Sequence, residues 1–253
     1  MKVTIVTIFP DWFTSPFAEG MIRVAREAGR LEVEVVNLRA FTDDFHQTVD
    51  DSPFGGGPGM IMKIEPIDRA LRSLALPPKG ERPAGLKVAL TSPQGARFDQ
   101  RRAIEWAGLD HLVIVCGRYK GVDERVAEQL IDEEFSIGDF VLSGGEPAAL
   151  VVVDAVARLQ DGVVGKFDSV ESDSFHSGLL DCAYWTRPAD YGGWKVPDVL
   201  LSGHHAQIAK ARREEALRRT LERRPDLLES AELTDDDRKT LRRLRREREG
   251  GGA

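Results

Sequence analysis

The segment HLVIVCGRYKGVDERV, residues 111–126, decides the fold of this 253-residue chain. His111 to Val115 is a continuous apolar run, typical of a strand that is buried on both faces of a parallel sheet. The segment from Gly117 to Gly121 has the composition of a turn, and Asp123 is suited to cap a following helix. A buried strand, a glycine turn and a helix in this order predict a βα unit and therefore an α/β protein.

Outward from this segment, short β-branched runs alternate with helical patterns over the first 160 residues. Further strands are expected at Val3–Phe9, Leu31–Val36 and Leu86–Leu90. Helices are expected at Met21–Ala28, Ile67–Leu76 after Pro66, Arg97–Ala107 and Glu146–Leu159. The alternation predicts a largely parallel sheet, and the apolar composition of the helix at 146–159 predicts that it is well buried.

The remaining chain changes character twice. Residues 161–178 are small and polar, with little to bury, and predict a mobile linker between an α/β domain at 1–160 and a helical domain at 179–253. Two helices are expected in the helical domain. Ser202 is a candidate cap for the first, and Thr234 with Asp237 three residues later resembles a capping box for the second.

Charge and composition bound the possible functions. The formal net charge of -7 argues against a uniformly basic surface, yet residues 238–248 are rich in Lys and Arg, as is the chain just upstream. These cations indicate either a surface that binds nucleic acid or a solvated helix face with Glu–Arg pairs, and charge alone favours the two interpretations about equally.

No apolar run is long enough to span a bilayer and no signal segment is present, so we expect a cytoplasmic protein. Cys116 and Cys182 have no disulfide or zinc spacing, so we expect no metal site and both thiols buried or inert.

Glycine is concentrated in four short segments, at residues 55–59, 92–95, 117–121 and 137–146, and three of them follow strands. Ligands of open α/β sheets bind beyond the carboxyl ends of the strands, where glycine lets the backbone approach them closely. A single glycine turn is more often plain turn chemistry, but several at strand ends together favour a ligand site.

Several familiar motifs are absent from the sequence. It has no GxxxxGK[ST] loop, and no GxGxxG after the first strand with an acidic residue about 20 positions later. It also has no GxSxG or HExxH string, and no Cys/His pairing that indicates nucleophilic catalysis. His204 and His205 are adjacent and fall on different helix faces, so metal binding by them is not favoured. ATP hydrolysis and NAD binding are therefore disfavoured.

Five longer strings resemble the bacterial tRNA (guanine-N1)-methyltransferase family, and the likeness spans nearly the whole chain. They are DDSPFGGGPGM (50–60), CGRYKGVDERV (116–126), SIGDFVLSGGE (136–146), LLSGHH (200–205) and ERRPDLL (222–228). The resemblance implies the SPOUT class, in which the parallel-sheet α/β domain forms a deep trefoil knot and carries a small C-terminal helical domain. It implies a homodimer with active sites shared between subunits. The implied reaction is methyl transfer from S-adenosyl-L-methionine to N1 of the guanosine immediately 3′ of the anticodon, position 37 of tRNA.

The resemblance also implies the site residues. The cofactor loops of the family match Thr91, Ser92, Pro93, Gly117, Tyr119, Ile137, Gly138, Asp139, Phe140, Val141, Leu142, Gly144 and Gly145. The general base of the family matches Asp173, and its partner matches Arg158. These residue types suit the chemistry, because guanine N1 carries a proton that a carboxylate must remove, while a guanidinium stabilises the charge that builds on O6.

Rival assignments remain beside these. Asp168 and Glu171 are the nearest alternatives to Asp173, and any of these acids could simply keep the linker soluble. Asp50 is a weaker candidate for a contact with the target base and could equally be a turn carboxylate.

The chain departs from the family pattern at two positions. Lys120 stands where the family string commonly has glutamate, which puts any carboxylate contact there in doubt. Phe140 replaces a more usual tyrosine, which loses a hydroxyl but keeps the ring. Two other functions stay open: a non-catalytic RNA-binding dimer, and a different α/β enzyme that binds a nucleotide.

Overall fold

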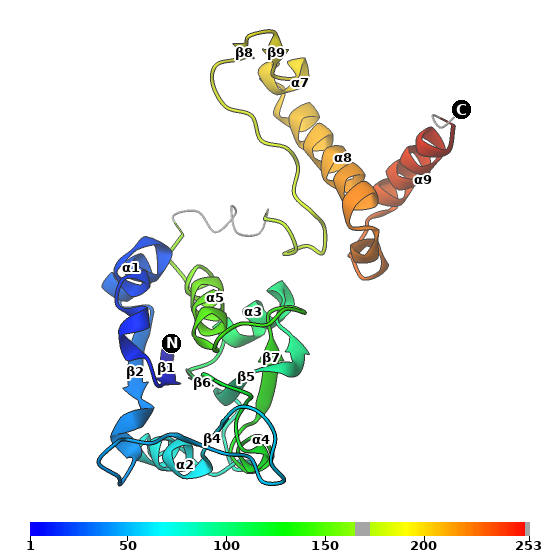
Figure 1. The fold of residues 1–253 in the computed structure, drawn as a ribbon. Helices are drawn as coiled ribbons and strands as arrows, with labels where there is room; N and C mark the ends of the chain where they lie inside the picture. The colour runs from blue at the N-terminus through cyan, green and yellow to red at the C-terminus, as the bar shows by residue number, and fades with distance from the viewer. Residues whose placement is uncertain (165–172, 251–253) are drawn as a thin grey trace. The chain divides into compact units, whose positions relative to one another are not determined.

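The computed structural model describes residues 1–164 and 173–250. The chain divides into two compact units, Met1–Lys166 and Phe167–Ala253. Each unit is described here by itself (Figure 1).

The first unit is built on a five-stranded sheet in which every strand pair is parallel, in the order β2-β1-β6-β5-β7. The strands are β1 (Lys2–Thr7), β2 (Glu32–Asn37), β5 (Leu86–Arg97), β6 (His111–Val115) and β7 (Glu133–Ser136). A short antiparallel pair, β3 (Asp50–Asp51) with β4 (Ile61–Met62), lies outside this sheet. The predicted parallel α/β class is confirmed.

Helices cover both faces of the sheet (Figure 1). The cluster on one face involves α1 (Gly20–Glu27), α3 (Gln100–Ala107) and α5 (Glu146–Ala157), and the other face carries α2 (Ile64–Ser73) and α4 (Glu124–Gln129). Three 3₁₀ helices complete the unit, η1 (Pro10–Phe13), η2 (Pro16–Ala18) and η3 (Leu38–Phe41).

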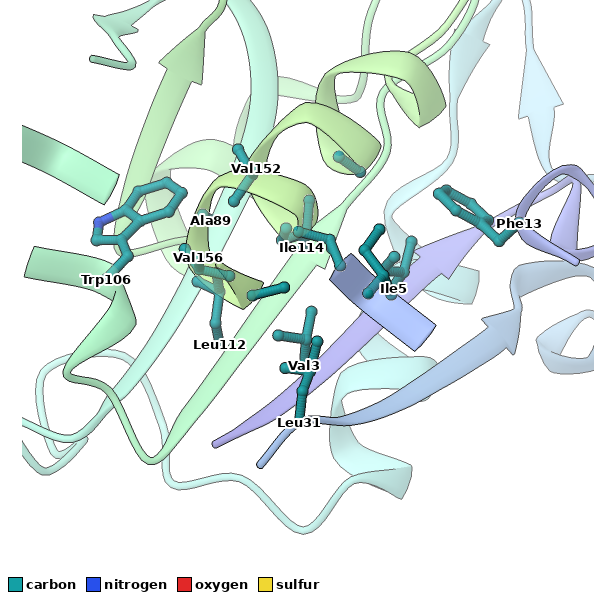
Figure 2. Close-up of a cluster of buried hydrophobic side chains, with 14 of the residues drawn as sticks. Val3, Ile5, Phe13, Leu31, Ala89, Trp106, Leu112, Ile114, Val152 and Val156 are labelled. Atoms are coloured by element: carbon teal, nitrogen blue, oxygen red, sulfur yellow. The ribbon is translucent and has the colours of Figure 1, made fainter. Parts of the chain in front are cut away.

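Strand β6 shows how the two faces are filled. Leu112 and Ile114 point to the α5 side, and Val113 and Val115 to the α2 side, because successive strand residues face opposite ways. Figure 2 shows the α5 side, where Val152 lies near Ile114. The expected buried strand and the expected buried helix at 146–159 are both confirmed, although α5 ends at Ala157.

Some predicted boundaries were wrong. Helix α2 begins at Ile64, before Pro66, because proline is tolerated in the first turn where its missing N–H has no partner. Strand β5 continues to Arg97, and α3 therefore starts at Gln100 and not at Arg97 as predicted. The residue before α3, Asp99, caps the helix, because its carboxylate accepts a hydrogen bond from the Arg102 N–H at 2.9 Å. The predicted Asp123 cap is confirmed, since its carboxylate accepts from the Arg125 N–H at 3.0 Å.

The second unit holds two longer helices around a leucine cluster. Its elements are β8 (Asp190–Tyr191), β9 (Trp194–Lys195), α7 (Asp198–Leu201), α8 (His205–Arg223), η4 (Pro225–Glu229) and α9 (Asp235–Gly250). Leu217 and Leu221 of α8 pack with Leu241 and Leu244 of α9. The two expected helices are present, while α7 and the β8–β9 hairpin were not anticipated.

One predicted cap in this unit is confirmed and one is wrong. The Asp237 N–H donates to Thr234 Oγ1 at 3.1 Å and the Thr234 N–H donates to Asp237 Oδ2 at 2.9 Å, which is the reciprocal capping box. Ser202 does not cap α8, because it ends α7 and its hydroxyl accepts from the N–H of His204, the residue before α8.

The predicted linker at 161–178 falls partly outside the described residues, because residues 165–172 are not among them. The candidate acids Asp168 and Glu171 therefore also lie outside the described residues. On one side of this gap, Val163 is buried in the core of the first unit. On the other side, the Phe175 N–H donates to the Leu179 carbonyl at 2.7 Å, and Leu179 is buried in the leucine cluster. Within the described residues, no helix is long and apolar enough to cross a membrane.

Candidate functional site

The glycine-containing loops of the first unit gather at one edge of its sheet. Because the strands are parallel, their carboxyl ends lie at the same edge, and β1, β6, β5 and β7 are neighbours there in that order. Gly117 follows β6, Ile137 follows β7, and residues 92–95 form a bulge within β5, whose pairing with Phe135 skips from Thr91 to Ala96. The predicted cofactor loops therefore come from three adjacent strands.

Two of these loops are bonded to each other. The Gly145 N–H donates to the Gly117 carbonyl at 2.8 Å, and Arg118 pairs with Gly144 as an antiparallel bridge. Thr91 joins them, because its hydroxyl accepts from the Gly117 N–H at 2.9 Å. The loops after β6 and before α5 thus cross at a fixed point beside β5.

The crossing has no room for side chains at two glycines. A Cβ atom at Gly145 would overlap Thr91 Oγ1, and one at Gly144 would overlap Arg118 Nε. The protein's own packing therefore accounts for these two glycines, and their contact with a cofactor stays a prediction.

A glycine-rich hairpin borders the Gly117–Gly121 turn. The Met62 N–H donates to the Gly121 carbonyl at 3.0 Å, and the Lys120 N–H donates to the Met60 carbonyl at 3.1 Å. In this hairpin Gly55, Gly56, Gly57 and Gly59 have φ values of 81°, 76°, 118° and 94°. Such a run of left-handed backbone requires glycine. The lysine that departs from the family pattern is exposed and lies over Gly59.

Tyr119 connects the same turn to Asp50. Partial burial, the negative charge of Asp50 and a hydrogen bond with it raise the pKa of the Tyr119 hydroxyl, while Arg39 opposes the shift. The Tyr119 backbone has φ 60°, which is uncommon for a non-glycine residue. Asp50 is thereby placed beside a predicted cofactor residue, and a role at the target base stays a prediction.

The loop at Ile137–Leu142 presents apolar side chains to the outside. Phe140 is 56% exposed, Val141 97% and Leu142 40%. The Ser136 hydroxyl bonds both the N–H and the carbonyl of Gly138, which holds the start of the loop.

Sequence reasoning missed a buried carboxylate beneath these loops. Glu146, the first residue of α5, is 0% exposed, and its Oε1 accepts from the Thr7 hydroxyl at 2.7 Å. Its Oε2 lies 3.4 Å from Arg118 Nε. The available signal was a single acidic residue at the head of an otherwise apolar, buried helix, since such a group is almost always paired.

The two predicted catalytic residues belong to different units. Arg158 is the C-terminal cap residue of α5, half-buried, as expected from its place after a buried helix. Asp173 begins a turn in which its backbone carbonyl accepts a hydrogen bond from the His176 N–H at 3.3 Å. The hydroxyl oxygen of the next residue, Ser174, accepts from the Asp181 N–H at 2.9 Å. Asp173 therefore stands in a segment that is bonded to its own unit.

Many arginines of the second unit form ion pairs with its carboxylates. Arg213 bonds Asp237, and Arg243 bonds both Glu214 and Glu247 at 2.8 Å. Within 173–250, no ion pair is found for Arg242, Arg245 or Arg246. The solvated helix face with Glu–Arg pairs, one of the two interpretations of the sequence, is thus present. Arg242, Arg245 and Arg246 are cations of the same unit that could contact nucleic acid.

The second unit also contains a cavity of about 330 Å³ with aromatic and cationic walls. Tyr184, Trp185, Arg187 and Arg212 line it, and the Arg212 guanidinium lies 5.7 Å from the centre of the Tyr184 ring.

Both cysteines are buried and free, as expected, and burial raises the pKa of the Cys116 thiol well above its usual value. Among the described residues, no group of three or more His, Cys, Asp or Glu side chains is placed to hold a metal ion.

The fold and the loops define a class: an α/β protein with an all-parallel five-stranded sheet, whose glycine-containing loops meet at the carboxyl edge of that sheet, where such proteins bind ligands. Comparison with known families matches residues 1–230 to tRNA (Guanine-1)-methyltransferase TrmD. The tRNA (guanine-N(1)-)-methyltransferase of Geobacter sulfurreducens is 50% identical over 249 residues, covering 98% of this chain and 100% of that protein. The enzyme of the same name from Koribacter versatilis is 48% identical over 97% of this chain and 98% of its own length.

The chain therefore belongs to the tRNA (guanine-N1)-methyltransferase family, as its sequence strings indicated. Membership in a family of enzymes argues against both alternatives, the non-catalytic RNA-binding dimer and the unrelated nucleotide-binding enzyme.

Proposed function

We propose that this chain transfers a methyl group from S-adenosyl-L-methionine to N1 of the guanosine at position 37 of tRNA, immediately 3′ of the anticodon. The observation that carries the proposal is the family match across residues 1–230, combined with three loops from adjacent strands at the ligand-binding edge of the sheet. Because the proposed substrate is tRNA, we also propose a cytoplasmic location.

The chemistry of the loops fits this methyl donor better than a nucleotide with phosphates. Residues 91–93 and 137–142 contain no lysine or arginine, and of the two cations in the middle loop Arg118 is directed at Glu146 and Lys120 lies over Gly59. A phosphate needs free cations or the glycine-rich N-terminus of a helix, and the N-terminus of α5 already carries the Glu146 carboxylate. The apolar side chains of Phe140 and Leu142 and the loop main chain suit a neutral adenosine, for which we propose main-chain hydrogen bonds to adenine from these loops.

Two side chains carry the proposed chemistry. When bound, S-adenosyl-L-methionine would supply an electrophilic methyl group, with the electron pair of the broken S–CH3 bond staying on the sulfur of the departing S-adenosylhomocysteine. The Asp173 carboxylate takes the proton from guanine N1 as the N–C bond forms there, so the proton ends on Asp173 and the electron pair of the N–H bond stays with the base. The Arg158 guanidinium donates hydrogen bonds to O6, where negative charge builds, and therefore stabilises the transition state more than the ground state.

We assign tRNA binding to the helical unit. Arg242, Arg245 and Arg246 of α9 can contact phosphates, and such contacts make affinity fall with salt. The cavity walls formed by Tyr184, Trp185 and neighbouring arginines support the same role, because nucleobases stack on aromatic rings and guanidinium planes.

We also propose the trefoil knot and the homodimer that the resemblance implies. In support of the knot, the chain leaves β7 at the edge of the sheet, crosses the loop after β6 at Gly144 and Gly145, and enters α5, which packs on the strands at the centre. Knots are rare, so the family membership carries most of this argument. The exposure of Val141 and Phe140 leaves apolar surface that a second subunit can cover at a shared active site.

One experiment tests the activity and the general base. The full chain is incubated with labelled S-adenosyl-L-methionine and unmodified tRNA with guanosine 3′ of the anticodon, and the methylated position is mapped. We expect N1-methylguanosine at that position, and no product from a tRNA with adenosine there. Failure of the wild-type chain to transfer the methyl group to the guanosine would contradict the proposed function.

The Asp173→Ala variant then tests the base assignment alone. Its kcat should fall by about 100-fold to 10,000-fold, the usual contribution of a general base. Asp161→Ala is the matched control, because Asp161 is an exposed acid at the start of the same predicted linker and should be dispensable. Full activity of Asp173→Ala would refute the base assignment and leave the methyltransferase proposal standing.

A further inference from the structure

Beneath the proposed cofactor loops, a single carboxylate connects three parts of the sheet edge. Glu146 is fully buried, and its Oε1 accepts from the hydroxyl of Thr7, the last residue of β1. Its position in the first turn of α5 also places the negative charge at the positive end of the helix dipole. Helix α5 has no side-chain cap at Gly145, and Glu146 is the acidic residue of its first turn.

Arg118 is the cationic partner of this carboxylate. Its Nε lies 3.4 Å from Glu146 Oε2, and its guanidinium lies 4.3 Å from the centre of the Phe9 ring, in a cation–π contact. Within the described residues, neither Nε nor Oε2 has a hydrogen-bond partner. The pair is therefore close but not tightly bonded, which makes it a poor source of folding stability once the cost of burying two charges is counted.

The backbone is shaped around this pair. A Cβ atom at Gly144 would overlap Arg118 Nε and lie 2.5 Å from Glu146 Oε2, so it would sit between the two charged groups. The same residues form the crossing of the loops, where Arg118 bridges Gly144 and the Gly145 N–H bonds Gly117. A side chain at position 144 would therefore force Arg118 or Glu146 to move.

We infer that Arg118 and Glu146 are a positioning pair, which holds the loop after β6 against the loop before α5 so that both face the methyl donor in one fixed geometry. This inference rests on the proposed function for the identity of the ligand. Neither residue is assigned a contact with the donor or the guanine. The pair acts through Gly117, Tyr119 and the segment at 137–142, whose relative placement it sets.

The test compares two ion pairs at opposite edges of the same sheet, each with one buried and one partly exposed side chain. Glu146→Gln removes the charge at the loop crossing but keeps an oxygen for Thr7. The control is Asp132→Asn, because Asp132 precedes β7, bonds the Val88 N–H at 2.8 Å and pairs with the buried Arg82 at 2.8 Å. For each protein, binding of S-adenosylhomocysteine is measured by calorimetry, stability by urea unfolding, and KM separately for donor and tRNA.

We expect Glu146→Gln to weaken S-adenosylhomocysteine binding and raise the donor KM by about tenfold to a hundredfold, the loss that a small misplacement of a site causes. The KM for tRNA should not change. Asp132→Asn should lose stability and keep the wild-type affinity for the ligand. Wild-type affinity in Glu146→Gln, or an equal loss of affinity in Asp132→Asn, would overturn the inference, since the role would then be structural.

A conservative variant covers the case in which Glu146→Gln does not fold. Arg118→Lys keeps the positive charge but lacks the Nε atom and the planar group over Phe9, and we expect an intermediate loss of affinity at near-normal stability. Unchanged affinity in this variant would also refute the inference. The wild-type protein is measured first, because absence of binding there refutes the proposed donor, whereas binding that survives both substitutions refutes only the positioning pair.

Discussion

The capping box at the start of α9 makes the stability of the helical unit depend on pH through one carboxylate. Asp237 is 4% exposed, and both of its oxygens accept hydrogen bonds from Arg213, at 3.0 and 2.9 Å. Arg213, aided by the Thr234 N–H and opposed by burial, lowers the pKa of Asp237 from 3.8 to about 2. At about 1.4 kcal/mol for each pH unit, this difference stabilises the folded state by about 2 kcal/mol when the carboxylate is ionised.

The sign of the effect follows from the direction of the pKa shift. Because the folded pKa lies below the unfolded one, the stabilisation is fully present above pH 4 and is lost as the pH falls from about 4 to 2. Asp237→Asn should therefore lower the free energy of unfolding by about 1 to 2 kcal/mol at neutral pH, since the amide still accepts from the Thr234 N–H but loses the charge opposite Arg213. The difference between the variant and the wild type should shrink towards zero near pH 2.

The assay is urea unfolding followed by far-ultraviolet circular dichroism across this pH range. Asp235→Asn is the matched control: Asp235 is in the same helical turn and pairs with Arg238 at 3.1 Å, but its side chain is 91% exposed. An exposed pair of this kind contributes at most about 1 kcal/mol. A stability difference for Asp237→Asn that stays constant with pH, or that the control reproduces, would refute the linkage to Asp237.

Two further predictions concern the first unit, both measured by urea unfolding. Gly145→Ala should lower the free energy of unfolding by about 1 to 3 kcal/mol, because its methyl group would overlap the Thr91 hydroxyl at the loop crossing, and an unchanged midpoint would contradict this account. Ile114→Ala should cost about 2 to 5 kcal/mol, because Ile114 is fully buried in the cluster that includes α5, whereas the same change at the 42% exposed Ile104 should cost much less. Equal effects at these two isoleucines would show that burial does not set the loss.

Elements whose residues are apolar in a local pattern could be predicted from the sequence. Strand β6 matched its expected bounds, because all of its residues except His111 are buried and the run is continuous. Strand β7 was not anticipated, since only Phe135 of its EEFS sequence is buried. Its Glu133 pairs with Lys87 at 2.9 Å and Arg102 at 2.7 Å, so long-range ion pairs accommodate a charged residue that a local pattern assigns to a loop.

The site was predictable in its location but not in its internal connections. Glycine turns after strands indicated the carboxyl edge of the sheet, and this is where the structure places Gly117 and Ile137. The contacts of Glu146 with Arg118 and Thr7 depend on how the chain returns past β6, which no local pattern encodes. The assignments of Asp173 and Arg158 came from the resemblance alone and stay predictions.

The glycines at this edge serve at least two different purposes, and the distinction bears on how a ligand is recognised. Gly95, Gly144 and Gly145 leave room for protein atoms, because a Cβ at each would overlap Phe135, Arg118 or Thr91. Gly55, Gly56 and Gly57 have open space around them and are required by their left-handed backbone instead. Close approach of a ligand is therefore not needed to explain any of these six.

On the proposed function, ligand recognition at this edge depends on groups that the packed glycines hold in place. These are the main chain and side chains of the loop at 137–142 and the ring of Tyr119, which are exposed beside the crossing. Because the crossing is filled by Thr91, Arg118 and Glu146, the loops cannot approach each other further when a ligand binds. A site with that constraint is preorganised, so less of the binding energy is needed to order it.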